Sequence, residues 1–113
     1  MLNKSRSPKV IIVSSSAGSI GRMAERTEPP PPMQYYGSSK AAANFLTVYY
    51  SKKYPSWKVN AVDPGRRATA MSKAKVDEET DPALGAVRVT ELVKEGPGGV
   101  TGTYSQLEGP MLW

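Results

Sequence analysis

Short apolar blocks separated by polar and proline-rich segments divide the chain, and each block predicts one element. The first block, residues 10–13, is a β-branched run without alternation, which is typical of a strand buried on both faces of a parallel sheet. We expect this strand over residues 9–14. It opens into the small polar run from Ser14 to Gly18, and open α/β sheets bind their ligands at this carboxyl end of the strands.

The second block predicts a helix over residues 35–53, because its apolar positions repeat with the spacing of one helix face. This stripe consists of Ala42, Phe45, Leu46, Tyr49 and Tyr50. We expect the stripe, with Tyr49 in it, to pack against the rest of the fold. Lys52 and Lys53 suit the negative end of the helix dipole, and Pro55 ends the helix.

The later blocks predict two more strands and one more helix. They are a strand over residues 57–62, a helix from Pro82 to about Lys94 capped by Asp81, and a strand over residues 103–106. Residues 19–34, with four consecutive prolines, predict an irregular surface loop, and residues 66–80 a polar loop. The order strand, helix, strand, helix, strand predicts an α/β fold with a doubly wound parallel sheet and a right-handed crossover.

Composition narrows the function classes. The chain has 113 residues, enough for one domain, and contains neither cysteine nor histidine. This excludes disulfides, thiolate metal sites and histidine-based triads, so we expect no metal site. The net charge of +5 comes from scattered residues without a recognition motif, so we expect no nucleic-acid partner. No apolar run follows Met1, which predicts a cytoplasmic protein without a signal peptide or membrane span.

Tyr36 and Lys40 are the strongest candidates for chemistry. They lie four apart at the start of the predicted helix, so the phenol and the ammonium share one face. A phenol ordinarily titrates near ~10, and a cation about 4 Å away favours its ionised form. Tyr49 and Lys53 have the same spacing, so spacing alone leaves two interpretations open: an active-site pair or a solvated helix start. The face of Tyr36 carries the small or polar residues Ala43 and Thr47.

Four segments together resemble a known family. They are Val-Ser-Ser-Ser-Ala-Gly at 13–18, Tyr-Gly-Ser-Ser-Lys-Ala-Ala at 36–42, Val-Asn-Ala-Val-Asp-Pro-Gly at 59–65, and Thr69. In this order and at these element boundaries, the chain resembles the C-terminal half of the short-chain dehydrogenase/reductase family, over roughly residues 8–113. The resemblance implies that residues 1–113 form half of a Rossmann-like domain, with a proline-rich loop insertion at about 19–34.

The resemblance also implies a reaction, namely NAD(P)-dependent hydride transfer between an alcohol and a carbonyl of a small-molecule substrate. Tyr36 would exchange a proton with the substrate oxygen, and Lys40 would ease ionisation of the phenol and bind the nicotinamide ribose. Ser15 would hydrogen-bond the substrate oxygen, although its neighbours Ser14 and Ser16 leave this assignment open by one position.

A second set of residues matches the family's cofactor-binding segment. Pro64, Gly65, the backbone near Arg67, and Thr69 would hold the nicotinamide carboxamide and the cofactor phosphates. The glycine-rich phosphate loop of the family is absent from the chain. The residues that choose NAD or NADP are expected upstream, so either cofactor fits the resemblance.

We therefore expect an oxidoreductase fragment, truncated relative to the family, with little activity alone. The alternative is a non-catalytic half-domain that docks on a full-length relative through the helix over residues 36–53. A homo-oligomer is consistent with either interpretation, because this helix commonly forms part of a dimer interface in the family.

Overall fold

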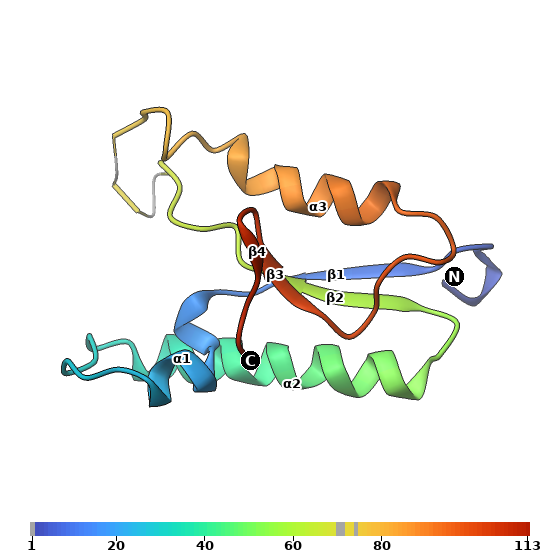
Figure 1. The fold of residues 1–113 in the computed structure, drawn as a ribbon, viewed down its shortest axis with the longest axis horizontal. Helices are drawn as coiled ribbons and strands as arrows, with labels where there is room; N and C mark the ends of the chain where they lie inside the picture. The colour runs from blue at the N-terminus through green and yellow to red at the C-terminus, as the bar shows by residue number, and fades with distance from the viewer. Residues whose placement is uncertain (1, 70–71, 74) are drawn as a thin grey trace.

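A four-stranded sheet lies between two long helices in the computed structural model, which describes residues 2–69, 72–73 and 75–113 (Figure 1). The strands are β1 (Lys9–Val13), β2 (Lys58–Val62), β3 (Tyr104–Gln106) and β4 (Gly109–Pro110), in the order β1-β2-β3-β4. The helices are α1 (Ile20–Ala24), α2 (Gln34–Lys53) and α3 (Leu84–Lys94), with 3-10 turns η1 (Leu2–Lys4) and η2 (Ser16–Gly18). Helices α2 and α3 cover opposite faces of the sheet (Figure 1).

The predicted α/β class and its parallel sheet are confirmed. Strands β1 and β2 pair in parallel from Lys9↔Lys58 to Val13↔Val62, and β3 continues the parallel order beside β2. The strand predicted at 57–62 begins one residue later than expected, as does the one at 103–106. All three parallel strands point their carboxyl ends toward the same side of the molecule, where α1 and the two long loops lie (Figure 1).

The core is centred on β2 rather than on β1. The side chains of Val59, Ala61 and Val62 are completely buried, because β2 has a strand on each side and a helix on each face. The prediction that β1 is buried on both faces is wrong: its residues are half-buried, and Val13 is 52% exposed. Within the described residues, β1 pairs only with β2, so it lies at the edge of the sheet.

Helix α2 begins one residue before the predicted start and ends at Lys53 as expected. The face that it turns toward the sheet, however, is not the predicted apolar one. The predicted packing stripe is solvent-exposed, with Phe45 at 69% and Tyr49 at 45%. The side chains that face the sheet are the small polar ones, Asn44, Thr47 and Ser51, which are all buried. Small residues let the helix approach closely: a Cβ on Gly102, in the chain leading into β3, would lie 2.9 Å from Ser51 Oγ.

The segment 19–34 is not irregular throughout, because α1 forms within it. Ser19 caps this helix by accepting a hydrogen bond from the Arg22 amide at 3.1 Å, and its hydroxyl donates to Leu112 O at 2.7 Å. The amide of Gly21 donates to Trp113 O at 2.6 Å. The apolar C-terminal tail, for which the sequence shows no partner, therefore packs beside α1.

Helix α3 starts at Leu84, two residues after the predicted Pro82. The Asp81 carboxylate accepts a hydrogen bond from the Ala83 amide at 2.8 Å, so the predicted cap closes a turn that precedes the helix. At the other end, the Lys9 ammonium donates to Val93 O at 2.6 Å and to Glu95 O. This cation stabilises the negative end of α3 and ties it to β1. No helix in the described ranges combines the length and hydrophobicity needed to cross a membrane.

Candidate active site

The turn after β1 is tied to α2 by buried polar groups. Ser14, which is 2% exposed, donates from Oγ to Asn44 Oδ1 at 2.5 Å. The Asn44 amide in turn donates to Gly18 O at 3.2 Å. Buried polar groups of this kind are stable only when paired. Ser14 therefore has a structural partner. Ser15 Oγ accepts a hydrogen bond from the Ala17 amide at 3.3 Å, and both Ser15 and Ser16 line a cavity of about 860 Å³.

Asp63 joins the ends of β1 and β2. Its carboxylate accepts hydrogen bonds from the Ser16 amide at 2.7 Å and from the Gly65 amide at 2.8 Å. The side chain is 6% exposed. The serine turn and the Pro64-Gly65 turn are thus held side by side at the carboxyl edge of the sheet, where the sequence predicts ligand binding.

Tyr36 and Lys40 lie at the same edge. The Lys40 ammonium is 5.7 Å from the centroid of the Tyr36 ring and donates to Val13 O at 3.0 Å. Tyr36 is 40% exposed. The residue after Tyr36, Gly37, packs against η2 so closely that a Cβ there would lie 2.8 Å from Ala17 O. The structure therefore brings the start of α2, the serine turn and the end of β1 together.

Tyr49 and Lys53, the second pair with this spacing, have a similar geometry but lie away from the candidate site. The Lys53 ammonium lies 5.5 Å from the Tyr49 ring centroid, much as Lys40 lies from Tyr36. That pair is on the last turns of α2, at the opposite end of the helix from the serine turn (Figure 1). Of the two pairs, the one formed by Tyr36 and Lys40 lies beside the carboxyl end of β1.

The segment after β2 folds back on itself. The Arg67 guanidinium donates to Glu79 O at 2.7 Å, and the Thr69 amide donates to Ser72 Oγ at 3.0 Å. Gly65, with φ of +71°, supplies the left-handed turn after Pro64. Pro64 and Gly65 lie next to the serine turn, while Arg67 and Thr69 bond within their own loop. Residues 70, 71 and 74 of the predicted polar loop lie outside the described residues.

Tyr104 is a residue that the sequence analysis places on a strand without any further role. It is 2% exposed, and its hydroxyl has no hydrogen-bond partner in the described part of the chain. Burial, and next the negative charge of Asp63, raise the pKa of Tyr104 to about 12, against weaker opposition from Ser14 and Arg22. Its phenol therefore lies within electrostatic reach of the candidate site. A tyrosine in a short C-terminal strand carries no sequence signal for such a position.

We expect Tyr104→Phe to raise the free energy of unfolding by about 1 kcal/mol, because the change removes a buried hydroxyl that lacks a partner. In the native protein the raised pKa stabilises the neutral phenol. The contribution of the neutral phenol to the free energy of unfolding is complete below pH 10 and is lost as the pH rises to about 12. Urea denaturation and phenolate absorbance across this range measure both effects. Tyr35→Phe, at a side chain 84% exposed, is the control and should change neither; a loss of stability in Tyr104→Phe would contradict the assignment.

The chain is similar in sequence to a known protein. No protein-family model matches the chain. The chain is 37% identical over 120 residues to the short-chain dehydrogenase/reductase ATR10 of Stachybotrys chlorohalonatus, an alignment that covers 96% of this chain and 42% of that protein. The chain is related to the short-chain dehydrogenases/reductases.

Solved structures agree with this relationship. Carbonyl reductase Sniffer of Drosophila melanogaster shares 26% identity with a TM-score of 0.69, over 93% of this chain and 41% of that one. The NADPH-bound carbonyl reductase from chicken fatty liver shares 25% identity with a TM-score of 0.66, over 93% of this chain and 42% of that one. Salutaridine reductase of Papaver somniferum shows the same fold, with 23% identity and a TM-score of 0.75. That match covers 92% of this chain and 47% of that one. The chain spans less than half the length of each of these proteins.

Proposed function

We propose that this chain is the C-terminal, catalytic half of an NAD(P)-dependent short-chain oxidoreductase that transfers hydride between an alcohol and a carbonyl. The observation that carries the proposal is the position of Tyr36 and Lys40. Their side chains lie together at the carboxyl end of β1, with the Lys40 ammonium bound to the last carbonyl of that strand. The short-chain dehydrogenase/reductase relationship supports it, and a cytoplasmic location stays a prediction.

Each residue of the site has a role in this proposal. Tyr36 donates the proton from its hydroxyl to the carbonyl oxygen, or accepts one from the alcohol, and the Lys40 ammonium lies beside its ring. Ser15, exposed to the cavity and not engaged with Asn44 as Ser14 is, hydrogen-bonds the substrate oxygen as charge develops on it. The hydrogen bond from Ser14 to Asn44 ties the serine turn to α2.

The residues present fit the nicotinamide end of a dinucleotide. An ammonium has three donors, and Lys40 uses one on Val13 O, which leaves two for the ribose hydroxyls. Pro64 and Gly65, held beside the serine turn by Asp63, would border the nicotinamide, and Arg67 and Thr69 would follow along the cofactor. The bound cofactor supplies or accepts the hydride. NAD and NADP fit these residues equally well.

A fluorescence titration of the purified 113-residue chain with NADPH, and separately with NADH, tests the proposal. We expect weak but saturable binding, because the glycine-rich phosphate loop is absent. Lys40→Met should weaken this binding. Lys53→Met is the matched control, because it removes the same charge from the same helix beside an equivalent tyrosine. Absence of binding, or an equal loss in both variants, would contradict a nicotinamide site at Lys40.

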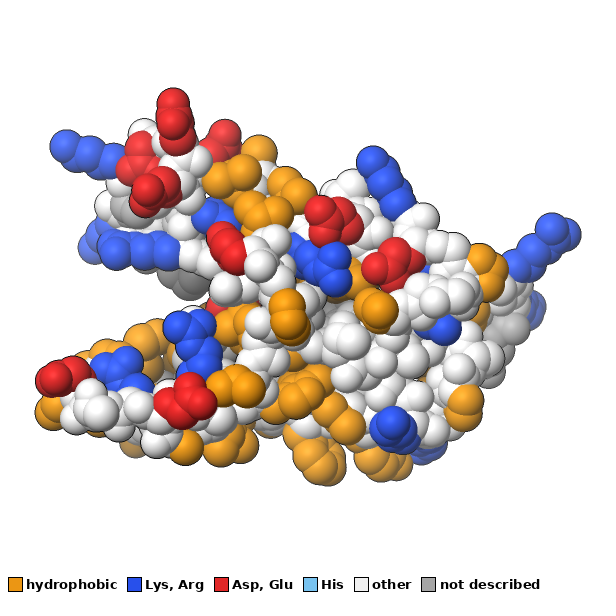
Figure 2. All heavy atoms as spheres, viewed as in Figure 1, with side chains coloured by type: hydrophobic (Ala, Val, Ile, Leu, Met, Phe, Trp, Pro, Cys, Tyr) orange, Lys and Arg blue, Asp and Glu red, His pale blue; other side chains and the backbone are white. Residues whose placement is uncertain are grey.

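The exposed stripe of α2 favours a second function, that of a non-catalytic half-domain that docks through this helix. Phe45, Leu46, Tyr49 and Tyr50 are all exposed on it. Figure 2 shows apolar side chains gathered along the lower edge of the molecule, where α2 lies in Figure 1. Clustered apolar side chains on a surface helix are typical of a protein contact.

If α2 is a contact surface, the mass of the chain in solution should rise with concentration, and Phe45→Ser should lower it. Phe45, at 69%, is the most exposed large apolar side chain of the stripe, so its loss removes about 1.5–3 kcal/mol of burial from each copy. Analytical ultracentrifugation measures the change. Val76→Ser, at a loop side chain 73% exposed, should leave the mass unchanged. A concentration-independent monomer would rule out self-association through α2.

A further inference from the structure

The cavity beside the serine turn contains two arginines that the proposed proton and hydride transfer does not use. It has a volume of about 860 Å³ and is open to solvent, because Arg22, Arg26 and prolines 30–32 in its wall are all exposed. The wall combines three kinds of surface. It is apolar at Met23, Met33 and prolines 30–32, polar at Ser15 and Ser16, and cationic at Arg22 and Arg26.

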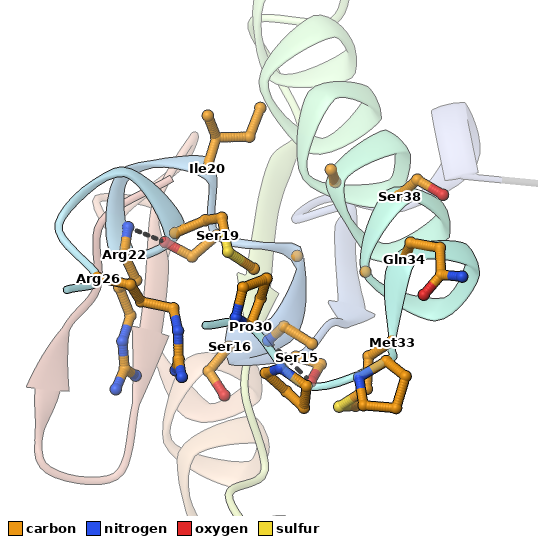
Figure 3. A pocket seen from close by; sticks show the side chains of 17 residues that line it. Ser15, Ser16, Ser19, Ile20, Arg22, Arg26, Pro30, Met33, Gln34 and Ser38 are labelled. Atoms are coloured by element: carbon orange, nitrogen blue, oxygen red, sulfur yellow. Dashed lines mark hydrogen bonds between the residues drawn. The ribbon is translucent and has the colours of Figure 1, made fainter. Parts of the chain in front are cut away.

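The two arginines face the cavity together. Arg22 lies in the last turn of α1, and Arg26 follows two residues after the helix ends at Ala24. In Figure 3 their side chains run side by side toward the part of the pocket where Ser16 lies. The Arg26 guanidinium donates to Pro29 O at 3.2 Å. Across residues 2–69, 72–73 and 75–113, neither arginine forms an ion pair with a carboxylate.

Two neighbouring cations without a carboxylate partner repel each other, and an anion between them relieves this repulsion. A carboxylate suits the arrangement, because the planar guanidinium binds its two oxygens through two parallel hydrogen bonds. The other walls indicate the rest of the ligand. Methionine and proline side chains accept an apolar carbon skeleton, and Ser15 and Ser16 add polar groups to the wall.

We propose that this cavity binds a carbonyl or alcohol substrate that carries a carboxylate, with Arg22 and Arg26 holding the carboxylate and Ser15 facing the reacting oxygen. The inference rests on the proposed function, because the cavity shares Ser15 with the proposed site. Tyr36 and Lys40 lie beside the cavity rather than in its wall, which Gly37, the residue after Tyr36, does line.

Calorimetric titration of the 113-residue chain with 4-acetylbenzoate and with its methyl ester tests the inference. The two ketones differ mainly in charge. We expect the acid to bind about tenfold more tightly, because a charged hydrogen-bonded pair contributes more than a neutral one. The double variant Arg22→Gln/Arg26→Gln should bind both ligands equally.

A charge-matched control separates the cavity from the general attraction of a basic chain for anions. Arg6→Gln/Lys52→Gln removes the same two charges at exposed positions outside the cavity wall and should keep the preference for the acid. If circular dichroism shows that the double glutamine variant is unfolded, Arg22→Lys/Arg26→Lys replaces it. That variant keeps the charge but loses the planar fork, so a smaller loss of preference is expected.

Three results would overturn the inference: no binding of either ketone, equal binding of acid and ester by the native chain, or a preference that survives in the cavity variant or disappears in the control. A parallel titration with NADPH distinguishes this failure from failure of the proposed function. Preference for the acid without any NADPH binding would contradict the oxidoreductase proposal alone. NADPH binding that depends on Arg22 and Arg26, with no preference for the acid, would assign the arginines to the cofactor and overturn the inference.

Discussion

Replacing Tyr36 by Phe is expected to lower kcat for carbonyl reduction by about 10²–10⁴-fold, the usual contribution of a positioned general acid. The substitution removes only the hydroxyl, so the ring keeps its position beside the Lys40 ammonium. Little turnover is expected from the chain alone. The measurement is therefore made on the chain fused behind the cofactor-binding half of a short-chain reductase, with NADPH and a simple aryl ketone.

Tyr49→Phe provides the control for this prediction. Tyr49 lies on the same helix, is comparably exposed and also has a lysine near its ring, yet it is distant from the serine turn and should retain full activity. Equal losses in both variants would indicate a structural effect of the helix. Unchanged activity in Tyr36→Phe would contradict the catalytic assignment and favour the docking function of α2.

The largest expected effect on stability belongs to Gly18→Ala. A Cβ at this position would lie 2.5 Å from Lys40 Cβ, 2.6 Å from the Lys40 carbonyl carbon and 2.7 Å from the Ala41 amide nitrogen. Two of these atoms belong to the backbone of α2, so the helix itself must move. Forced overpacking of this kind costs about 1–3 kcal/mol and occasionally more. The same movement should displace Lys40 and weaken any cofactor binding that depends on it.

Urea denaturation measures this loss, as a lower midpoint at unchanged slope. Gly96→Ala is the matched control, because nothing lies within 4 Å of a Cβ there and its φ is not in the left-handed region. It should leave stability unchanged or raise it by about 0.4–1 kcal/mol through the unfolded state. A Gly18→Ala variant as stable as the native chain would mean that the contact between η2 and α2 is looser than the structure shows.

The positions of the main elements could be predicted from the sequence because each has a strong local signal. The β-branched run before the serine turn, the helix closed by Pro55 and the Asp63-Pro64-Gly65 turn are recognisable within a few residues. The conjunction of Tyr36, Lys40 and Ser15 at one edge also follows, since the carboxyl ends of parallel strands meet on the same side of a sheet. The family resemblance assigns roles to these residues, and those roles stay predictions.

Features that depend on long-range packing could not be predicted. The apolar stripe of α2 indicates burial by any local rule, yet the sheet accepts only the small face of the helix at Asn44, Thr47 and Ser51. Helix α1 has only five residues and no apolar periodicity, and it is held by the C-terminal tail about ninety residues later. Tyr104 and the cavity arginines acquire their surroundings from segments distant in sequence.

The outward-facing apolar stripe of α2 also has a consequence for the path of folding. During early collapse, the aromatic side chains of this helix gain more by burial than its small polar ones, by about 1.5–3 kcal/mol for each large side chain. The first compact states should therefore press Phe45 and Tyr49 against the strands, with the helix rotated away from its native position. Such a state must open before Asn44 can reach Ser14, which makes the helix rotation a natural kinetic barrier in refolding.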